Sequence, residues 1–157
     1  MKVLLAIDGS SFSEAAIAEV AERPWPQGTV VQVLTVVHSP TPMALDPAFV
    51  MAAIHVDQLE EQRRLAAVLV SAAAEHVKRR GADISVITRV LEGTPKEVIV
   101  EEADEWNADL IVMGSHGHRG FRRMILGSIA GAVVANARCS VQVVRAKHLL
   151  HDAQSAA

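Results

Sequence analysis

Aromatic residues are scarce in this chain of 157 residues, which holds three Phe, two Trp and no Tyr. We therefore expect a core built from Ala, Val, Leu and Ile. The scarcity argues against a binder of single-stranded nucleic acid, because such proteins stack bases on aromatic side chains. The net charge of −3 also argues against nucleic acid as the partner, since nucleic-acid-binding domains carry a basic excess.

Cysteine occurs once, at Cys139, so an internal disulfide is excluded. A single cysteine is typical of a reducing compartment. Asp8 ends the apolar run near the N-terminus, residues 3–7, which is too short for a signal peptide or a membrane span. These features predict a soluble cytoplasmic protein that does not associate with membranes. Cys139 precedes an apolar segment, and we expect its thiol to be buried and unreactive.

Apolar segments alternate with amphipathic segments along the chain, and Pro and Gly residues separate them. Strands are expected at residues 2–7, 29–37, 83–91, 108–114 and 139–145, and helices at 11–23, 56–80, 94–106 and 128–137. This alternation predicts an α/β fold, a doubly wound parallel sheet of five strands with helices on both faces. We expect one domain over residues 1–146 and a flexible tail over 147–157.

Short motifs mark the expected starts of three helices. Ser11 and Glu14 stand three residues apart, as do Thr94 and Glu97, and both pairs match a capping box. Ser128 is the expected N-cap of the last helix. By contrast, three prolines between residues 38 and 50 predict a long loop or lid over the ligand edge.

A glycine-rich segment, "GSHGHRGFRRMILGS", lies between the fourth expected strand and the last expected helix. Its spacing is Gly114-x2-Gly117-x9-Gly127-Ser128. Glycines allow a ligand to approach the backbone, and a helix N-terminus offers unpaired N–H groups to an anion. The segment therefore predicts a phosphate site, although it matches neither the Walker motif nor the dinucleotide motif. The alternative is a surface loop with solvated arginines.

This spacing resembles the phosphate motif of the ATP-binding universal stress proteins, G-x2-G-x9-G-[ST]. The resemblance extends over nearly the whole chain, through "KVLLAIDGSSFSEAAI", "LTVVHSP", "EGTPKEVIVEEADEWNADLIVMGSHG" and "GSIAGAVVANARCSVQVVR". It implies an adenine nucleotide alpha hydrolase-like sheet with strand order 3-2-1-4-5. It also implies that ATP binds at the carboxyl edge of the strands.

The resemblance assigns roles to individual residues of this chain. Asp8 matches the acidic residue beside the ribose and adenine, and Val36 matches the apolar residue against the adenine. Gly127 and Ser128 match the clamp on the β- and γ-phosphates. The full set of nucleotide-binding residues that it implies is Ala6, Ile7, Asp8, Val36, Met113, Gly114, Ser115, Gly117, His118, Gly127, Ser128 and Ile129.

The resemblance further implies a homodimer through the last strand, near Val141, Val143 and Val144. Ser140 departs from the family pattern, which often has Pro there, and this change affects the same edge. We expect a stress-response module in which ATP, with Mg²⁺ carried by its phosphates, controls conformation or an unidentified protein partner. A nucleotide-independent dimeric scaffold and a sensor of AMP, ADP or cyclic AMP are the alternatives.

We expect no ordinary enzyme activity, because no paired acid and base, nucleophile motif or metal cage stands out, although weak ATP hydrolysis stays open. His116 and His118 lack a third ligand nearby in the sequence and make a poor metal site. Arg119, Arg122 and Arg123 could reach phosphates, but solvated arginines are the commoner outcome.

Overall fold

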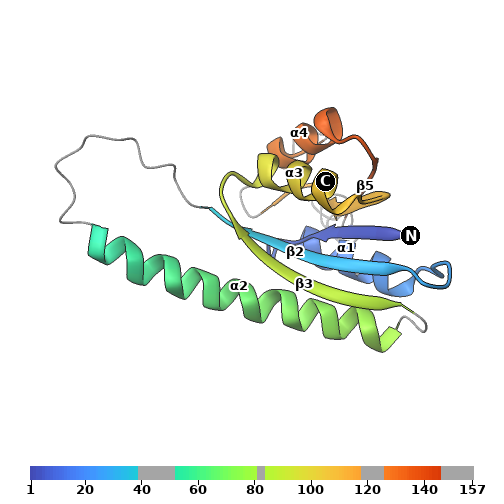
Figure 1. Ribbon diagram of the computed structural model, residues 1–157, viewed down its shortest axis with the longest axis horizontal. Helices are drawn as coiled ribbons and strands as arrows, with labels where there is room; N and C mark the ends of the chain where they lie inside the picture. Colours follow the sequence, from blue (N-terminus) through green and yellow to red (C-terminus); the bar gives the residue numbers. More distant parts are fainter. Residues whose placement is uncertain (39–51, 81–83, 118–125, 146–157) are drawn as a thin grey trace, which may run out of the picture.

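The computed structural model describes residues 1–38, 52–80, 84–117 and 126–145. Its five strands form one sheet of parallel strands in the order β3-β2-β1-β4-β5, which confirms the expected order (Figure 1). The strands are β1 (Lys2–Ala6), β2 (Val30–Val37), β3 (Ser85–Glu92), β4 (Leu110–Gly114) and β5 (Ser140–Val144). Each expected strand is found, with ends that differ by at most two residues.

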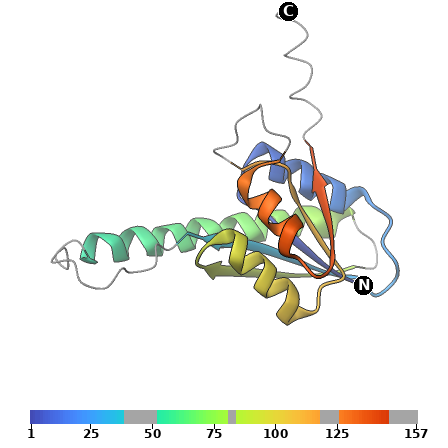
Figure 2. The same cartoon turned by 90° about the horizontal axis from the view of Figure 1, so that it is seen from above.

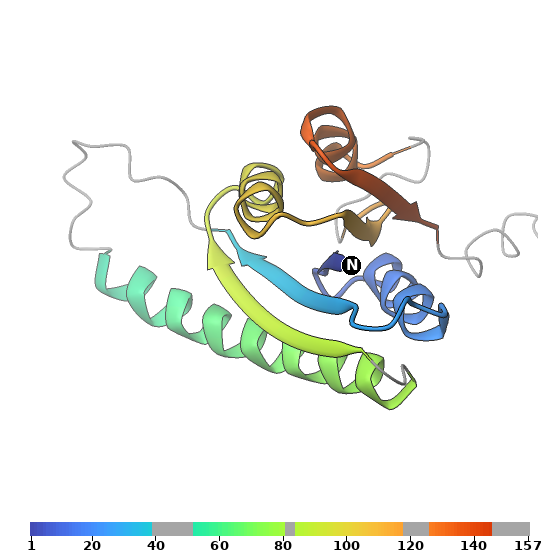
Figure 3. The ribbon, with the colours of Figure 1, turned by 45° about the vertical axis from the view of Figure 1, so that its right-hand side comes forward.

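Helices cover both faces of this sheet, as the alternating pattern predicts. On one face lie α1 (Ser11–Glu22) and α2 (Ala52–Arg80), and on the other lie α3 (Pro95–Trp106) and α4 (Ser128–Asn136) (Figures 2 and 3). In the described part of the chain, no helix is both long and apolar enough to cross a bilayer.

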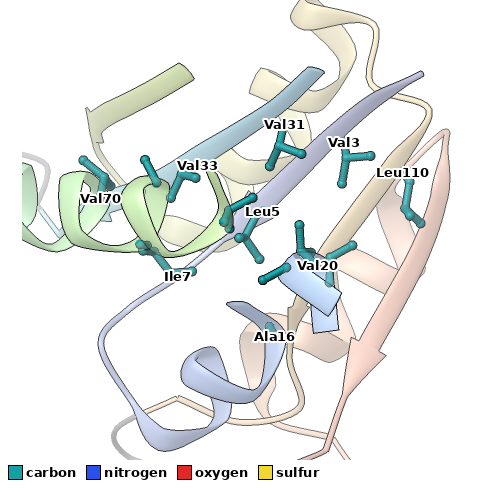
Figure 4. Packing of buried hydrophobic residues seen from close by; sticks show 14 residues of the cluster. Val3, Leu5, Ile7, Ala16, Val20, Val31, Val33, Val70 and Leu110 are labelled. Atoms are coloured by element: carbon teal, nitrogen blue, oxygen red, sulfur yellow. The ribbon is translucent and has the colours of Figure 1, made fainter. Parts of the chain in front are cut away.

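The core consists of two layers of small aliphatic side chains, one on each face of the sheet. Val3, Leu5 and Val33 face α1 and α2, where they meet Val20 and Val70 (Figure 4). The opposite layer joins the sheet to α3 and α4. Its buried members are Leu4, Ala6, Leu34, Ile99, Ala103, Ile111, Met113, Ala130 and Val133. Among the described residues, the buried hydrophobic side chains are Ala, Val, Leu and Ile with a single Met, as the shortage of aromatic residues predicts.

Two polar side chains interrupt the layer under α3. Gln32 of β2 and Glu102 of α3 are buried, and the Gln32 amide Nε2 donates to Glu102 Oε1 at 2.5 Å. Arg89 of β3 lies 3.5 Å from the same carboxylate oxygen and is half exposed. The sequence pattern did not indicate this cluster, because Gln32 lies in the middle of an apolar strand.

The thiol of Cys139 lies just before β5 and is half-buried rather than fully buried. Burial raises its pKa, and the nearby Asp104 carboxylate adds to the rise. Both effects disfavour the thiolate, which agrees with the expectation of low reactivity.

Candidate functional site

The turn after β1 holds the carboxylate of Asp8 in a fixed position. Its Oδ1 accepts from the backbone N–H of Ser10 at 3.0 Å and from the Ser10 hydroxyl at 2.6 Å. Gly9 between them has a φ of 79°, a conformation that glycine adopts readily. Asp8 itself is exposed, so the turn presents the carboxylate to solvent at the carboxyl edge of the sheet.

The same turn corrects the expected start of α1. The N-cap is Ser10, not Ser11, and the Ser10 side chain accepts from the backbone N–H of Ser13. The hydrogen bonds to Asp8 hold Ser10 in the extended conformation of a cap. Ser11 is therefore already the first residue of the helix, and its hydroxyl is exposed. At α3, Thr94 is the N-cap as predicted, but without a hydrogen bond from its side chain.

The loop after β4 packs tightly against α1 at its first residue. A Cβ atom on Gly114 would lie 2.7–2.8 Å from backbone and Cβ atoms of Phe12, so only glycine fits there. Ser115, which follows, is buried and donates its backbone N–H to the Val144 carbonyl of β5 at 2.8 Å. The base of the loop is therefore fixed between α1 and β5.

Gly117 brings this loop against the turn after β1. A Cβ atom on Gly117 would lie 2.6 Å from Asp8 Oδ2, which is closer than real Cβ contacts. Asp8 and the glycine loop therefore meet at the carboxyl ends of two neighbouring strands, β1 and β4. In an open α/β sheet, ligands bind at the carboxyl edge between two neighbouring strands whose following connections lead to opposite sides, as those of β1 and β4 do.

The start of α4 joins the same place. Gly127 donates its N–H to the Ser115 carbonyl at 2.8 Å, and its own carbonyl accepts from Gly131. Gly127 is thus the N-cap, which corrects the expectation for Ser128, because Gly127 has the extended conformation of a cap and Ser128 already lies in the helix. No described side chain caps this helix. The N–H groups of its first turn consequently have no side-chain acceptor at the cap position.

The residues expected near the adenine lie at the ends of β1, β2 and β4. Ala6 pairs with Leu34 on one side and with Met113 on the other, which places the three strand ends side by side. The backbone N–H of Ile7 donates to the Leu34 carbonyl at 2.9 Å. Val36 and Ile129 are half-buried against the same cluster as Ala6 and Met113.

Some expected residues cannot be placed. His118, Arg119, Arg122 and Arg123 lie outside the described residues, as do residues 39–50 of the proline-rich segment 38–50 that was expected as a long loop or lid. Among the residues that the structure places, no group of three His, Cys, Asp or Glu side chains could hold a metal ion.

Sequence reasoning missed three supporting side chains at this edge. Ser10 orients Asp8, and the hydroxyl of Thr35 in β2 donates to the Ile7 carbonyl. Phe12, at the start of α1, packs against Gly114 at the base of the glycine loop. Only Ser10 had a signal in the sequence, since it stands three residues before Ser13 in a serine-rich turn. Thr35 and Phe12 read as ordinary strand and helix residues.

The model of the universal stress protein family matches residues 1–145. The chain belongs to this family. A putative universal stress protein of Staphylococcus aureus strain USA300 is 32% identical over 97% of this chain and 88% of its own length. Universal stress protein MJ0531 of Methanocaldococcus jannaschii is 44% identical over 75 residues, which are 46% of this chain and 44% of that protein.

Solved structures of the family share the fold. UspA of Lactobacillus plantarum superposes with a TM-score of 0.79 at 27% identity, covering 92% of this chain and 97% of UspA. A family protein of Arabidopsis thaliana with AMP bound has a TM-score of 0.62 at 18% identity, with 92% and 91% coverage. A universal stress protein in complex with cAMP has a TM-score of 0.58 at 20% identity, with 94% and 98% coverage.

Proposed function

We propose that this universal stress protein binds an adenine nucleotide, with ATP as the preferred ligand, and acts as a nucleotide-dependent stress-response module. One observation carries the proposal. The Asp8 carboxylate, Gly117 and the start of α4 at Gly127 meet at a single edge of the sheet through direct contacts. An acceptor for ribose hydroxyls therefore lies beside backbone that can approach phosphates.

Each part of this edge has a chemical task in the proposal. Asp8 accepts hydrogen bonds from the ribose hydroxyls, and its position is kept by Ser10. Val36 offers an apolar contact to the adenine ring. The N–H groups at the start of α4 donate to the β- and γ-phosphates, where the helix dipole also favours negative charge. We expect Mg²⁺ to arrive with the phosphates.

Two relatives of the same fold support an adenine nucleotide as the ligand class. The Arabidopsis protein was solved with AMP and another family member with cAMP. AMP and cAMP share the adenosine portion with ATP, so the same contacts from Asp8 and Val36 would serve all three. The helix start at Gly127 favours a ligand with a longer phosphate chain, which is why ATP is preferred here.

We propose binding rather than catalysis as the role of this edge. The Asp8 carboxylate lies beside Gly117. In this proposal it orients the ribose and does not activate a water molecule. Under this proposal ATP turnover stays well below about one per second, at the low end of ordinary enzymes. A faster turnover that is lost in an Asp8→Asn variant would overturn the assignment to binding.

The direct experiment identifies nucleotide carried by the purified protein. Protein that has never been dialysed is denatured, and the released small molecules are identified by mass spectrometry. Titration calorimetry of the stripped protein with ATP, ADP, AMP, cAMP and GTP then ranks the ligands. Adenine nucleotides should bind in the micromolar range, which corresponds to about −8 kcal/mol. No released nucleotide and no binding heat would favour the nucleotide-independent scaffold.

A further inference from the structure

His116 lies in the loop after β4 and is packed between the starts of α1 and α4. Its imidazole ring is half-buried, and it stands against the Phe12 ring of α1 with the ring centroids 5.2 Å apart and tilted by 45°. This distance and tilt lie within the range of favourable aromatic pairs. Phe12 is the same residue whose backbone abuts Gly114, so α1 contacts the loop twice within three residues.

The other side of His116 faces the N-cap of α4. The position that a Cβ atom would take on Gly127 lies 3.2 Å from His116 Cα and 3.7 Å from the ring carbon Cδ2. Gly127 also donates to the carbonyl of Ser115, the residue just before His116. The ring atom Nδ1 lies 3.2 Å from the Ser115 hydroxyl, which fixes the direction of the ring. The imidazole therefore lies between Phe12 of α1 and Gly127, the N-cap of α4.

We propose that His116 is a positioning residue, which holds the start of α4 at a fixed place relative to α1 and to Asp8. The proposal rests on the proposed function for its effect on ligand binding, because the start of α4 is where the phosphates would bind. His116 acts through the position of the Gly127 N-cap, by the packing of its ring, and does not itself bind the phosphates. This role differs from metal binding, since no group of three His, Cys, Asp or Glu side chains that could hold a metal ion is found among the described residues.

The N–H groups at the start of α4 must be preorganised to bind phosphates. A phosphate site built from backbone N–H groups works only if those groups are held in place before the ligand arrives. Gly127 has no side chain of its own to pack, and no described side chain caps α4. The ring of His116 lies beside this N-cap, so its loss should loosen the phosphate end of the site and spare the adenosine end.

Three variants of the full chain test the proposal by calorimetry with ATP and with adenosine. His116→Ala should weaken ATP binding about tenfold, because the start of α4 must then be ordered when the ligand binds. Adenosine binding should change less than about twofold, because Asp8 and Val36 are untouched. His116→Phe keeps a ring against Phe12 and should restore most of the ATP affinity. His76→Ala removes another half-buried histidine, on α2, and should change neither ligand.

The pH dependence separates positioning from direct contact. If the ring acts by packing, the ratio of ATP affinities between the wild-type protein and His116→Phe stays constant from pH 6 to pH 8. If an imidazolium binds the phosphates, that ratio falls as the pH rises, and His116→Phe is as impaired as His116→Ala. Either of these last two results overturns the proposal, as does wild-type ATP affinity in His116→Ala.

A measurement without nucleotide keeps this inference separate from the proposed function. Amide hydrogen exchange by NMR follows the Gly127 N–H, which is bonded to the Ser115 carbonyl in the ligand-free protein. His116→Ala should accelerate its exchange several-fold, and His116→Phe should not. Unchanged exchange in His116→Ala overturns the positioning role. If the wild-type protein binds no nucleotide while the exchange result holds, the proposed function fails and the positioning role stands.

Discussion

A Cβ atom added to Gly117 would lie 2.6 Å from Oδ2 of Asp8, so the loop after β4 rests directly on the carboxylate that follows β1. This carboxylate cannot turn away without cost, because its other oxygen accepts two hydrogen bonds from Ser10. The contact joins two segments that are more than a hundred residues apart in the sequence. It makes the acidic group and the glycine motif parts of one site.

Gly117→Ala tests this contact through stability and binding together. The added methyl group must displace the end of the exposed Asp8 side chain, which should cost about 1 kcal/mol of unfolding free energy because the hydrogen bonds from Ser10 are disturbed. Adenosine and ATP should both bind more weakly, since the carboxylate proposed to hold the ribose is displaced. Urea denaturation and calorimetry measure the two effects.

The matched control for Gly117→Ala is the same change in an Asp8→Ala background. With the carboxylate removed, the methyl group meets no Oδ2 atom, so the stability cost of Gly117→Ala should shrink. An equal loss of stability in both backgrounds would mean that Asp8 and Gly117 are not in contact in solution.

Gly127→Val tests the start of α4. A Cβ atom there would lie 3.2 Å from the Ser115 carbonyl and from His116 Cα, and a β-branched residue has two further methyl groups to place. Because the φ of Gly127 is −66°, valine is not excluded by backbone conformation, and the fold should survive. The N-cap should shift and ATP binding should be lost, as calorimetry would detect.

Gly131→Ala is the control for the same helix. Gly131 lies within α4, and a Cβ atom on it meets nothing within 4 Å. Alanine there should stabilise the protein by about 0.5–1 kcal/mol through helix propensity and leave ATP binding unchanged. Retained ATP binding in Gly127→Val would contradict the assigned role of the helix start.

The sequence predicted the strands, the helices and their alternation because buried parallel strands are continuous apolar runs. The strand order and the pairing of Asp8 with the glycine motif came from the family resemblance, since periodicity alone does not specify neighbours. Cap positions were predicted less well. Ser10 and Gly127, rather than Ser11 and Ser128, are the N-caps, because hydrogen bonds to Asp8 and Ser115 set the backbone there.

Contacts between distant segments could not be predicted from local pattern. Phe12 and His116 meet only because α1 and the loop after β4 lie at the same edge of the sheet. Gln32 and Glu102 likewise meet across the interface of β2 and α3, 70 residues apart. A polar residue in an apolar strand gives no sign of which partner it will find.

Glu102→Met tests whether the buried carboxylate is needed by Gln32. The substitution removes the acceptor of the Gln32 amide, and Gln32 is only 1% exposed. Loss of a partner by a buried polar group costs about 1–3 kcal/mol, so the midpoint of urea unfolding should fall. The double variant Gln32→Met with Glu102→Met replaces both groups with apolar ones and should recover most of the loss. An equally destabilised double variant would contradict this account.

Val143→Lys tests the expected homodimer. Val141, Val143 and Val144 lie on β5, which is an edge strand of the sheet and is only half-buried. An apolar edge strand favours pairing with a second chain, and a lysine there opposes it. Sedimentation should show a dimer at micromolar concentration for the wild-type protein and a monomer for the variant. Val68→Lys, at an exposed position on α2, is the control and should stay dimeric. A wild-type monomer would rule out the β5 interface.

The pH dependence of Cys139 alkylation tests how the fold surrounds this thiol, which lies just before β5. Burial raises the pKa of this thiol, and the Asp104 carboxylate raises it further, so the neutral form is favoured in the folded protein. The thiolate is the reactive form, and its fraction at a given pH falls as the pKa rises. Alkylation by iodoacetamide at pH 8 should therefore be slower in the folded protein than in urea, and its rate should rise at higher pH in the folded protein. Asp104→Asn removes the negative charge and should shift the pH–rate curve toward lower pH, while Glu75→Gln on α2 should not. A folded-state curve that coincides with that of the unfolded chain would show that neither burial nor Asp104 acts on the thiol.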